Sequence, residues 1–92
     1  MVLKNQVALI TGASRGIGRA IAKRFAEEGA AVAVGARTPE GYDRVVAEIT
    51  NAGGLASGFP LDVTKDQQVV DTVQQVLITC GKIDILVNSA GI

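Results

Sequence analysis

The sequence predicts an α/β fold, a doubly wound parallel sheet with helices packed on both faces. Three observations support this prediction. Four short apolar runs begin 25, 24 and 28 residues apart, segments with helical spacing lie between them, and a glycine follows each of those segments. Strands that alternate with helices through short connections form parallel sheets with right-handed crossovers. At 92 residues the chain has room for one domain and no second one.

The apolar runs are the predicted strands, at residues 6–11, 31–36, 55–61 and 83–88. The first, second and fourth runs are apolar on consecutive residues instead of alternating, which is typical of parallel strands buried on both faces. The third run contains Pro60, which cannot donate to a sheet ladder and therefore favours an edge strand. The predicted strand order is 3-2-1-4, which opens a crevice between the first and fourth strands.

The segments between the strands each carry one apolar stripe at helical spacing. These stripes are Ile17, Ile21 and Phe25, then Val45, Val46, Ile49 and Ala52, and then Val69, Val70, Val73, Val76 and Leu77. Glycines suited to a left-handed C-terminal cap follow them, at Gly29, Gly53 and Gly81. Thr64 and Gln67 have the spacing of a capping box and are expected to open the third helix. Cys80 continues the third stripe, so we interpret it as a core residue and not a nucleophile.

Composition excludes several classes of function. Nine Lys and Arg residues balance nine Asp and Glu residues, so the chain lacks the basic patch typical of nucleic-acid binding. The longest apolar stretch, residues 29–36, is far shorter than the ~20 residues of a membrane span, and we expect a cytoplasmic protein. One cysteine and no histidine exclude an internal disulfide, a Ser-His-Asp triad and any His-ligated metal, so no metal site is predicted.

A glycine-rich turn, TGASRGIG at residues 11–18, follows the first predicted strand. Gly12 allows a tight turn, Gly16 lets the backbone approach a pyrophosphate, and Gly18 lets the next helix pack closely on the sheet. The N-terminus of that helix would then face the phosphates. No Gly-Lys-Ser/Thr sequence follows, which excludes a Walker A loop. Taken alone, the turn is equally an ordinary connection between a strand and a helix.

Two further motifs narrow this interpretation, and the three together resemble the short-chain dehydrogenase/reductase family. TGASRGIG matches its TGxxxGxG motif, Leu61-Asp62-Val63 matches its Asp-Val after the third strand, and Val87-Asn88-Ser89-Ala90-Gly91 matches its NNAG motif, with Ser89 in place of the second asparagine. The chain looks closest to β-ketoacyl-carrier-protein reductases, although glucose and other polyol dehydrogenases share this N-terminal half. The resemblance implies a Rossmann fold, of which residues 1–92 are the N-terminal, adenosine-binding half of a single dinucleotide-binding domain.

The resemblance also implies site residues. Those expected at the phosphates and the adenosine ribose are Gly12, Ser14, Arg15, Gly16, Ile17 and Gly18. Asp62 and Val63 would hold the edge of the adenine, and Asn88, Ala90 and Gly91 would form the floor beside the ribose. Two alternatives stay open: Asp62 caps a turn before the third helix, and Asn88 satisfies buried backbone between neighbouring strands.

The end of the second strand predicts which dinucleotide binds. An NAD site has a carboxylate there for the ribose 2′-hydroxyl, whereas this chain has Ala36 followed by Arg37. Arg37 and Arg15 are placed to converge on a 2′-phosphate, so we expect NADP (NADPH) in preference to NAD. The alternative is that Arg37 is a solvated loop residue.

The residues that carry the family's chemistry have no match here. The resemblance implies hydride transfer in which a tyrosine protonates the carbonyl oxygen of the substrate. A lysine four residues later would lower the pKa of that tyrosine, and a serine would hold the substrate. The only tyrosine, Tyr42, has Val46 four residues on, so no catalytic residue is predicted. We expect the N-terminal part of an NADP-dependent oxidoreductase with its Met1 start intact. The alternative is a non-catalytic nucleotide-binding or self-associating module.

The fourth predicted strand is an edge in the order 3-2-1-4. Natural edge strands are protected by charges, prolines or bulges, yet this one carries only Asp84. We therefore expect self-association through this open edge, or pairing of the edge with a missing C-terminal part.

Overall fold

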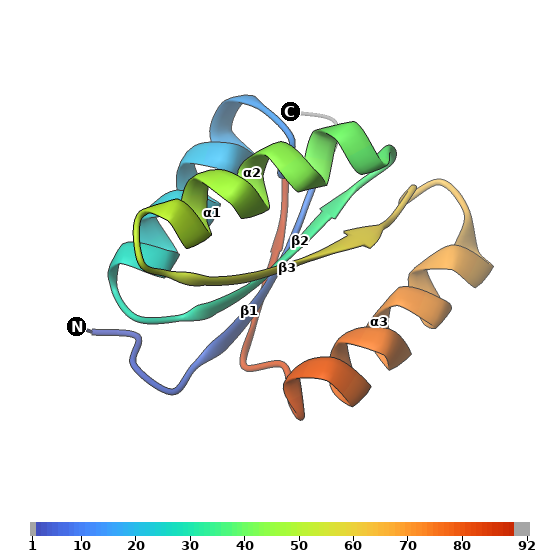
Figure 1. Cartoon of the computed structure of the whole chain (residues 1–92). Helices are drawn as coiled ribbons and strands as arrows, with labels where there is room; N and C mark the ends of the chain where they lie inside the picture. Colours follow the sequence, from blue (N-terminus) through green and yellow to red (C-terminus); the bar gives the residue numbers. More distant parts are fainter. Residues whose placement is uncertain (1, 90–92) are drawn as a thin grey trace.

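The computed structural model describes residues 2–89, which form one four-stranded parallel sheet and three helices (Figure 1). In chain order the elements are β1 (Val7–Thr11), α1 (Gly16–Glu27), β2 (Ala31–Ala36), α2 (Pro39–Asn51), β3 (Leu55–Pro60), α3 (Asp66–Cys80) and β4 (Ile85–Asn88). The strand order is β3-β2-β1-β4 and every pairing is parallel, which confirms the predicted fold class and order. Helices α1 and α2 cover one face of the sheet and α3 covers the other (Figure 1).

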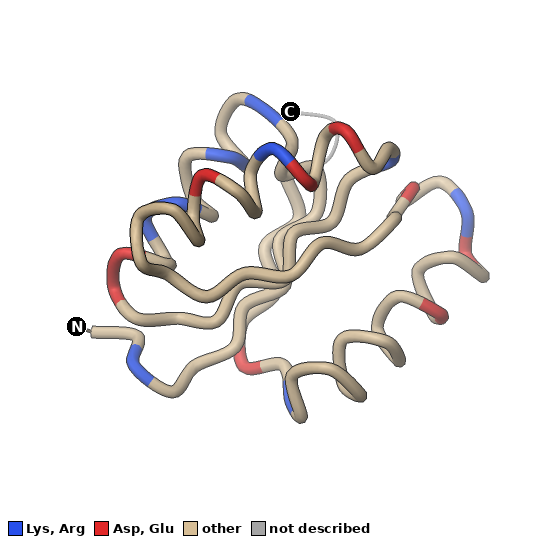
Figure 2. The backbone as a smooth tube through the Cα atoms, viewed as in Figure 1, with Lys and Arg blue, Asp and Glu red and all other residues tan. Residues whose placement is uncertain are grey.

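The two central strands are buried because helices cover both of their faces. On one face, Ile10 of β1 and Val34 of β2 pack in a cluster with residues of α1 and α2. On the other face, Leu9 of β1 packs with Val76 of α3. The strands carry no charged residue, and the charges lie on the helices and connections (Figure 2). Consecutive apolar residues in these two strands therefore indicated double-sided burial correctly.

Strand β3 is an edge, as Pro60 predicted. It pairs only with β2, and Pro60 ends it opposite Ala36. The following residue, Leu61, donates its backbone N–H to the Ala36 carbonyl at 2.8 Å, so the connection after β3 begins beside the end of β2.

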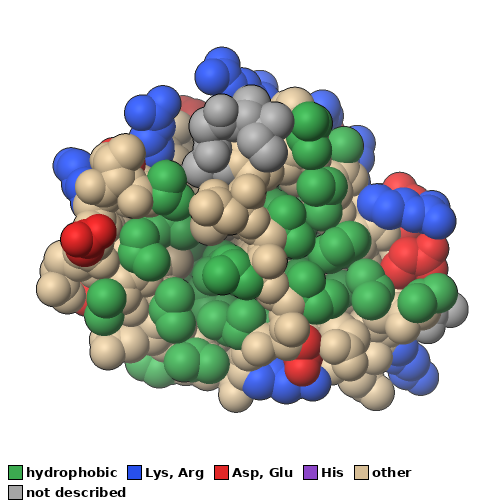
Figure 3. Space-filling view, turned by 180° about the vertical axis from the view of Figure 1, so that it is seen from behind, with side chains coloured by type: hydrophobic (Ala, Val, Ile, Leu, Met, Phe, Trp, Pro, Cys, Tyr) green, Lys and Arg blue, Asp and Glu red, His purple; other side chains and the backbone are tan. Residues whose placement is uncertain are grey.

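Strand β4 is not buried as predicted. It begins at Ile85 instead of residue 83, its residues alternate between half-buried and exposed, and Leu86 is 65% exposed. The physical reason is that β4 pairs only with β1, and no helix in residues 2–89 covers its α3-side face. Seen from behind, opposite to the β3 edge that lies in front in Figure 1, the molecule presents a broad hydrophobic surface (Figure 3).

The helix ends follow the glycine predictions but not the capping-box prediction. Gly29, Gly53 and Gly81 follow the three helices with φ of 96°, 90° and 84°, the left-handed region that favours glycine. Thr64 does not cap α3, whose N-cap residue is Lys65. Thr64 lies instead in the turn before α3, where its backbone N–H and its hydroxyl both donate to the Asp62 carboxylate.

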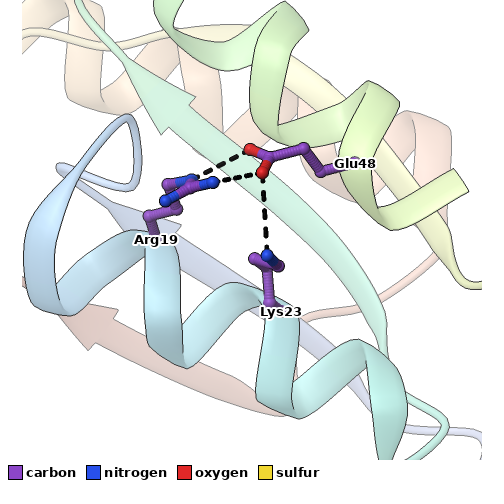
Figure 4. A network of polar contacts seen from close by, with 3 residues as sticks. All are labelled: Arg19, Lys23 and Glu48. Atoms are coloured by element: carbon purple, nitrogen blue, oxygen red, sulfur yellow. Dashed lines mark hydrogen bonds and ion pairs between the residues drawn. The ribbon is translucent and has the colours of Figure 1, made fainter. Parts of the chain in front are cut away.

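Helices α1 and α2 are joined by a network of three charged side chains (Figure 4). The Arg19 guanidinium of α1 donates to both carboxylate oxygens of Glu48 in α2, one of them from Nε at 2.9 Å. Lys23 Nζ lies 3.6 Å from the same carboxylate. The hydrogen bond from Arg19 lowers the pKa of Glu48 and, reciprocally, raises the pKa of Arg19. This network links α1 and α2, which lie side by side on the same face of the sheet.

Two residues considered in the sequence are half-buried and pack beside the core. Cys80 is half-buried beside the cluster of Leu9 and Val76, and burial raises the pKa of its thiol. The ring of Tyr42 lies against Gly58 of β3, where any Cβ would overlap it. Among residues 2–89 no helix is long and apolar enough to cross a membrane.

Candidate functional site

The connections after β1, β2 and β3 meet at the carboxyl ends of the strands and enclose a crevice of about 660 Å³. Its lining is Gly12, Ser14, Arg15, Gly16, Ile17, Gly18, Ala36, Arg37, Leu61, Asp62, Val63, Thr64 and Ser89. Ligands of open α/β sheets bind at this edge, beside the point where the strand order reverses. The crevice therefore brings together nine of the predicted site residues, which are far apart in the sequence.

The glycine-rich turn forms one wall of the crevice. Gly12 and Gly16 have φ of 64° and 59°, so a residue with a Cβ would be strained at either position. Nothing lies within 4 Å of where a Cβ of Gly16 would stand, which leaves the backbone open to a close approach. At Gly18 the reason for glycine is space, because a Cβ would overlap the Ser89 hydroxyl and the Gly12 carbonyl.

Helix α1 points its N-terminus at the same crevice. Its N-cap residue, Arg15, makes no side-chain capping hydrogen bond, and the first turn of the helix contains no acidic residue. The first backbone N–H groups of a helix have no partner within it and carry the positive end of its dipole. Together with the glycine backbone, they form an arrangement suited to a phosphate.

Asp62 lies across the crevice from the turn and has two roles. Its Oδ1 accepts hydrogen bonds from the Thr64 hydroxyl at 2.6 Å and the Thr64 backbone N–H at 3.0 Å. These hydrogen bonds lower the pKa of Asp62, with smaller contributions from the charges of Lys65 and Arg37. Asp62 thus closes the turn before α3, the alternative that the sequence left open, and also lines the crevice.

Sequence reasoning missed two neighbours of Asp62. Thr64 lines the crevice and fixes the Asp62 carboxylate, and the Gln68 side chain accepts a hydrogen bond from the Asp62 backbone N–H. The Asp-x-Thr spacing was a readable signal, since aspartate commonly accepts from the backbone and hydroxyl two residues later. Nothing in the local sequence signalled the role of Gln68, because that hydrogen bond depends on where α3 begins.

Asn88 does not line the crevice. Its Oδ1 accepts a hydrogen bond from the Thr11 hydroxyl at 2.9 Å, which joins the ends of β4 and β1. This contact favours the structural alternative for Asn88, although the bond is between side chains and not to backbone. Ala90 and Gly91 lie outside the described residues, and their expected place beside the ribose stays a prediction.

Two exposed arginines give the crevice its charge. Arg15 belongs to the glycine-rich turn and Arg37 follows β2, and neither makes an ion pair with another of residues 2–89. Asp62 is the only carboxylate in the lining. In the same part of the chain, no cluster of three or more His, Cys, Asp or Glu side chains is placed to hold a metal ion. The crevice is therefore suited to an anionic ligand.

Comparison with known proteins gives this arrangement a context. The family model described as short chain dehydrogenase matches residues 6–92. The chain belongs to the short-chain dehydrogenase family. This match confirms the family resemblance that the three motifs indicated. Members of this family are oxidoreductases that use a nicotinamide dinucleotide.

Individual members of the short-chain dehydrogenase family show how much of a longer protein the chain resembles. An uncharacterized oxidoreductase of Bacillus subtilis is 47% identical over 98% of this chain and 35% of its own length. A 3-oxoacyl-acyl-carrier-protein reductase of Vibrio harveyi is 46% identical over the whole chain and 36% of its own length. The crystal structure of a metagenomic short-chain oxidoreductase in complex with NADP superposes with a TM-score of 0.94 at 41% identity, over all of this chain and 42% of that one.

The chain thus spans about a third of the length of the first curated relatives it matches. Not every relative is so much longer. A short-chain dehydrogenase/reductase homologue of Bacillus subtilis is 41% identical, and the chain covers 85% of it.

Proposed function

We propose that this chain supplies the adenosine-binding half of an NADP-dependent oxidoreductase that transfers hydride between the cofactor and a carbonyl or alcohol. Membership of the short-chain dehydrogenase family supports the reaction type. The observation that carries the choice of NADP is the pair of arginines, Arg15 and Arg37, on the wall of one crevice, with Ala36 where an NAD site has a carboxylate. The likeness to a 3-oxoacyl-acyl-carrier-protein reductase makes a 3-oxoacyl thioester the first substrate to test.

The residues present fit the cofactor. The glycine-rich turn and the N-terminus of α1 would hold the pyrophosphate through backbone N–H groups. Arg37 and Arg15 would bind the 2′-phosphate by charge-assisted hydrogen bonds, and Asp62 and Val63 would hold the edge of the adenine. NADPH, when bound, supplies the hydride. The roles of Ser14 and Ile17 beside the phosphates and of Asn88, Ala90 and Gly91 beside the ribose remain predictions, as does a cytoplasmic location.

Cofactor choice is tested by titrating the chain with NADPH and NADH and with the corresponding 2′-phosphorylated and unphosphorylated ADP-ribose. A charge-assisted hydrogen bond contributes about 1.5–3 kcal/mol, so we expect a preference of about ten- to a hundredfold for the phosphorylated forms. Arg37→Ala should remove most of this preference. Arg44→Ala is the matched control, because Arg44 is an exposed arginine of α2 outside the crevice. Equal affinity of the unaltered chain for both forms would contradict the proposal.

Catalysis by the 92-residue chain alone is not expected. The only tyrosine, Tyr42, packs against β3 and is not in the lining of the crevice. Without a positioned acid the developing alkoxide is not protonated, and general acid catalysis typically contributes 10²–10⁴-fold. We expect no cofactor-dependent reduction of a 3-oxoacyl thioester above background when NADPH absorbance is followed. Stoichiometric turnover by the purified chain would contradict this expectation.

A second candidate function is a non-catalytic nucleotide-binding module that self-associates. Two observations favour it: the uncovered apolar face of β4, and the existence of a relative of which this chain covers 85%. A second copy of the chain is the partner that fits, since the chain has no net charge and the Lys82–Asp84 ion pair beside β4 is itself neutral. The mass of the native gene product separates the candidates. About 9.5 kDa favours the module, and a much larger mass favours the oxidoreductase.

A further inference from the structure

Ser89, which takes the place of an asparagine in the NNAG-like motif, contacts the start of the glycine-rich turn. Its hydroxyl donates to the Thr11 carbonyl, and the Gly12 carbonyl lies 3.4 Å from the same Oγ. Its backbone N–H also donates to the Thr11 carbonyl, at 3.3 Å. Ser89 is only 5% exposed, although it borders the crevice. A residue just after β4 thus contacts the first peptide groups of the glycine-rich turn, which is 78 residues away in the sequence.

The packing around this hydroxyl leaves little freedom. A Cβ at Gly18 would overlap both the Ser89 Oγ and the Gly12 carbonyl oxygen. The end of β4, the start of the turn and the first residues of α1 therefore meet at one point. A change in the position of the Ser89 hydroxyl would therefore shift both the glycine-rich turn and the N-terminus of α1, which together form the pyrophosphate site that we propose.

We propose that Ser89 is a positioning residue for phosphate binding, acting through the peptide groups of Thr11 and Gly12. A backbone carbonyl carries the negative end of the peptide dipole, so a carbonyl turned into the crevice would repel a phosphate and displace an N–H donor. The Ser89 hydroxyl occupies the Thr11 carbonyl and lies beside that of Gly12. It thereby favours the backbone conformation in which the turn presents N–H groups to the crevice. This inference rests on the proposed function, because the pyrophosphate belongs to the proposed cofactor.

The test compares two probes that share the adenosine end but differ in the pyrophosphate. NADPH contains it, whereas 2′-AMP has the adenine and the 2′-phosphate without it. Ser89→Ala should weaken NADPH binding about three- to tenfold, the range expected for the loss of one hydrogen bond, and change 2′-AMP binding less than about twofold. Affinities are measured by calorimetric titration of the full 92-residue chain.

Thr72→Ala is the matched control. Thr72 is 4% exposed, and its hydroxyl donates to the Pro60 carbonyl at 2.8 Å, away from the turn. Both alanine variants remove one buried hydroxyl that bonds to a backbone carbonyl, so both should lower thermal stability. Only Ser89→Ala should change the ratio of the two affinities.

Ser89→Cys replaces the hydroxyl with a somewhat larger thiol that is only a weak donor, so it removes the hydrogen bond without leaving a cavity and provides the same test if the alanine variant does not fold. An unchanged ratio of NADPH to 2′-AMP affinity in the folded Ser89 variants would overturn the positioning role and leave the proposed function standing. An equal loss for both probes would also overturn it, since that result indicates a general structural effect. If the unaltered chain binds neither probe, the proposed function is wrong and the role of Ser89 is wrong with it.

Discussion

Strands β2 and β4 flank β1 on opposite sides and have similarly apolar sequences, but only β2 is buried. The residues of β2 contact helices on both faces of the sheet, whereas Leu86 of β4 is 65% exposed. Both strands pair with β1 in register, but β2 also pairs with β3, whereas β4 is an edge strand. The helices add to this difference, because in residues 2–89 they cover both faces of β2 but leave the face of β4 that carries Leu86 uncovered. An apolar run therefore shows that a strand is suited to burial on both faces. Whether the strand is buried depends on whether helices or another chain pack against it.

The largest expected effect comes from two leucines that are neighbours in the sheet. Leu9 and Leu86 are paired in register, so they lie on the same face, but Leu9 is 1% exposed. Leu9→Ala should lower the free energy of unfolding by about 2–5 kcal/mol, because it leaves a cavity in the core. Leu86→Ala should change it by less than about 0.5 kcal/mol, as is usual for surface positions. Urea denaturation at low protein concentration measures both values.

A large effect of Leu86→Ala at low concentration would contradict the comparison, since it would mean that Leu86 is covered within one copy of the chain. An effect that appears only as the protein concentration rises would instead indicate cover by a second copy. The pair of variants thus separates burial within the chain from burial between chains.

The next effect concerns association through the face of β4. Leu86→Lys places a charge on this edge strand, and charges on edge strands oppose pairing with another chain. We expect it to weaken self-association about tenfold or more, measured by light scattering across micromolar concentrations. Leu55→Lys is the control, because Leu55 is 66% exposed on β3, the opposite edge of the sheet. A monomeric unaltered chain, or disruption by Leu55→Lys alone, would show that β4 is not the associating edge.

How far the sequence predicts this molecule also differs between regions. The order of the sheet and the glycine-rich turn were predicted correctly, because Pro60, Gly12 and Gly16 act through the backbone conformation at their own positions. The exposure of Leu86 was not predicted, because it depends on which other elements cover β4. The contact of Gln68 with Asp62 was not predicted either, because it depends on where α3 begins. Local covalent constraints can be read from single residues, whereas packing depends on which elements are present to pack.

The smallest expected effect is at the start of β4, where the charged side chain of Asp84 joins β4 to the buried strand β1. The Asp84 carboxylate accepts a hydrogen bond from the Val7 backbone N–H at 2.8 Å and lies 3.0 Å from Lys82 Nζ. The hydrogen bond from Val7, followed by the contacts with Lys82, lowers the pKa of Asp84. A group whose pKa is lower in the folded state stabilises the fold above its unfolded pKa, about 3.9 for aspartate, and loses that contribution as the pH falls through the folded value.

Asp84→Asn should therefore lower the midpoint of thermal unfolding near pH 7, and the difference from the unaltered chain should shrink as the pH falls below about 4. Asp43→Asn, at an exposed position of α2, controls for the change in net charge. A destabilisation by Asp84→Asn that stays constant from pH 7 to pH 3 would mean that the shape of the side chain, and not its charge, secures β4 against β1. A destabilisation that vanishes in acid would show that the ionised carboxylate of Asp84 helps to hold the N-terminal end of β4 against β1.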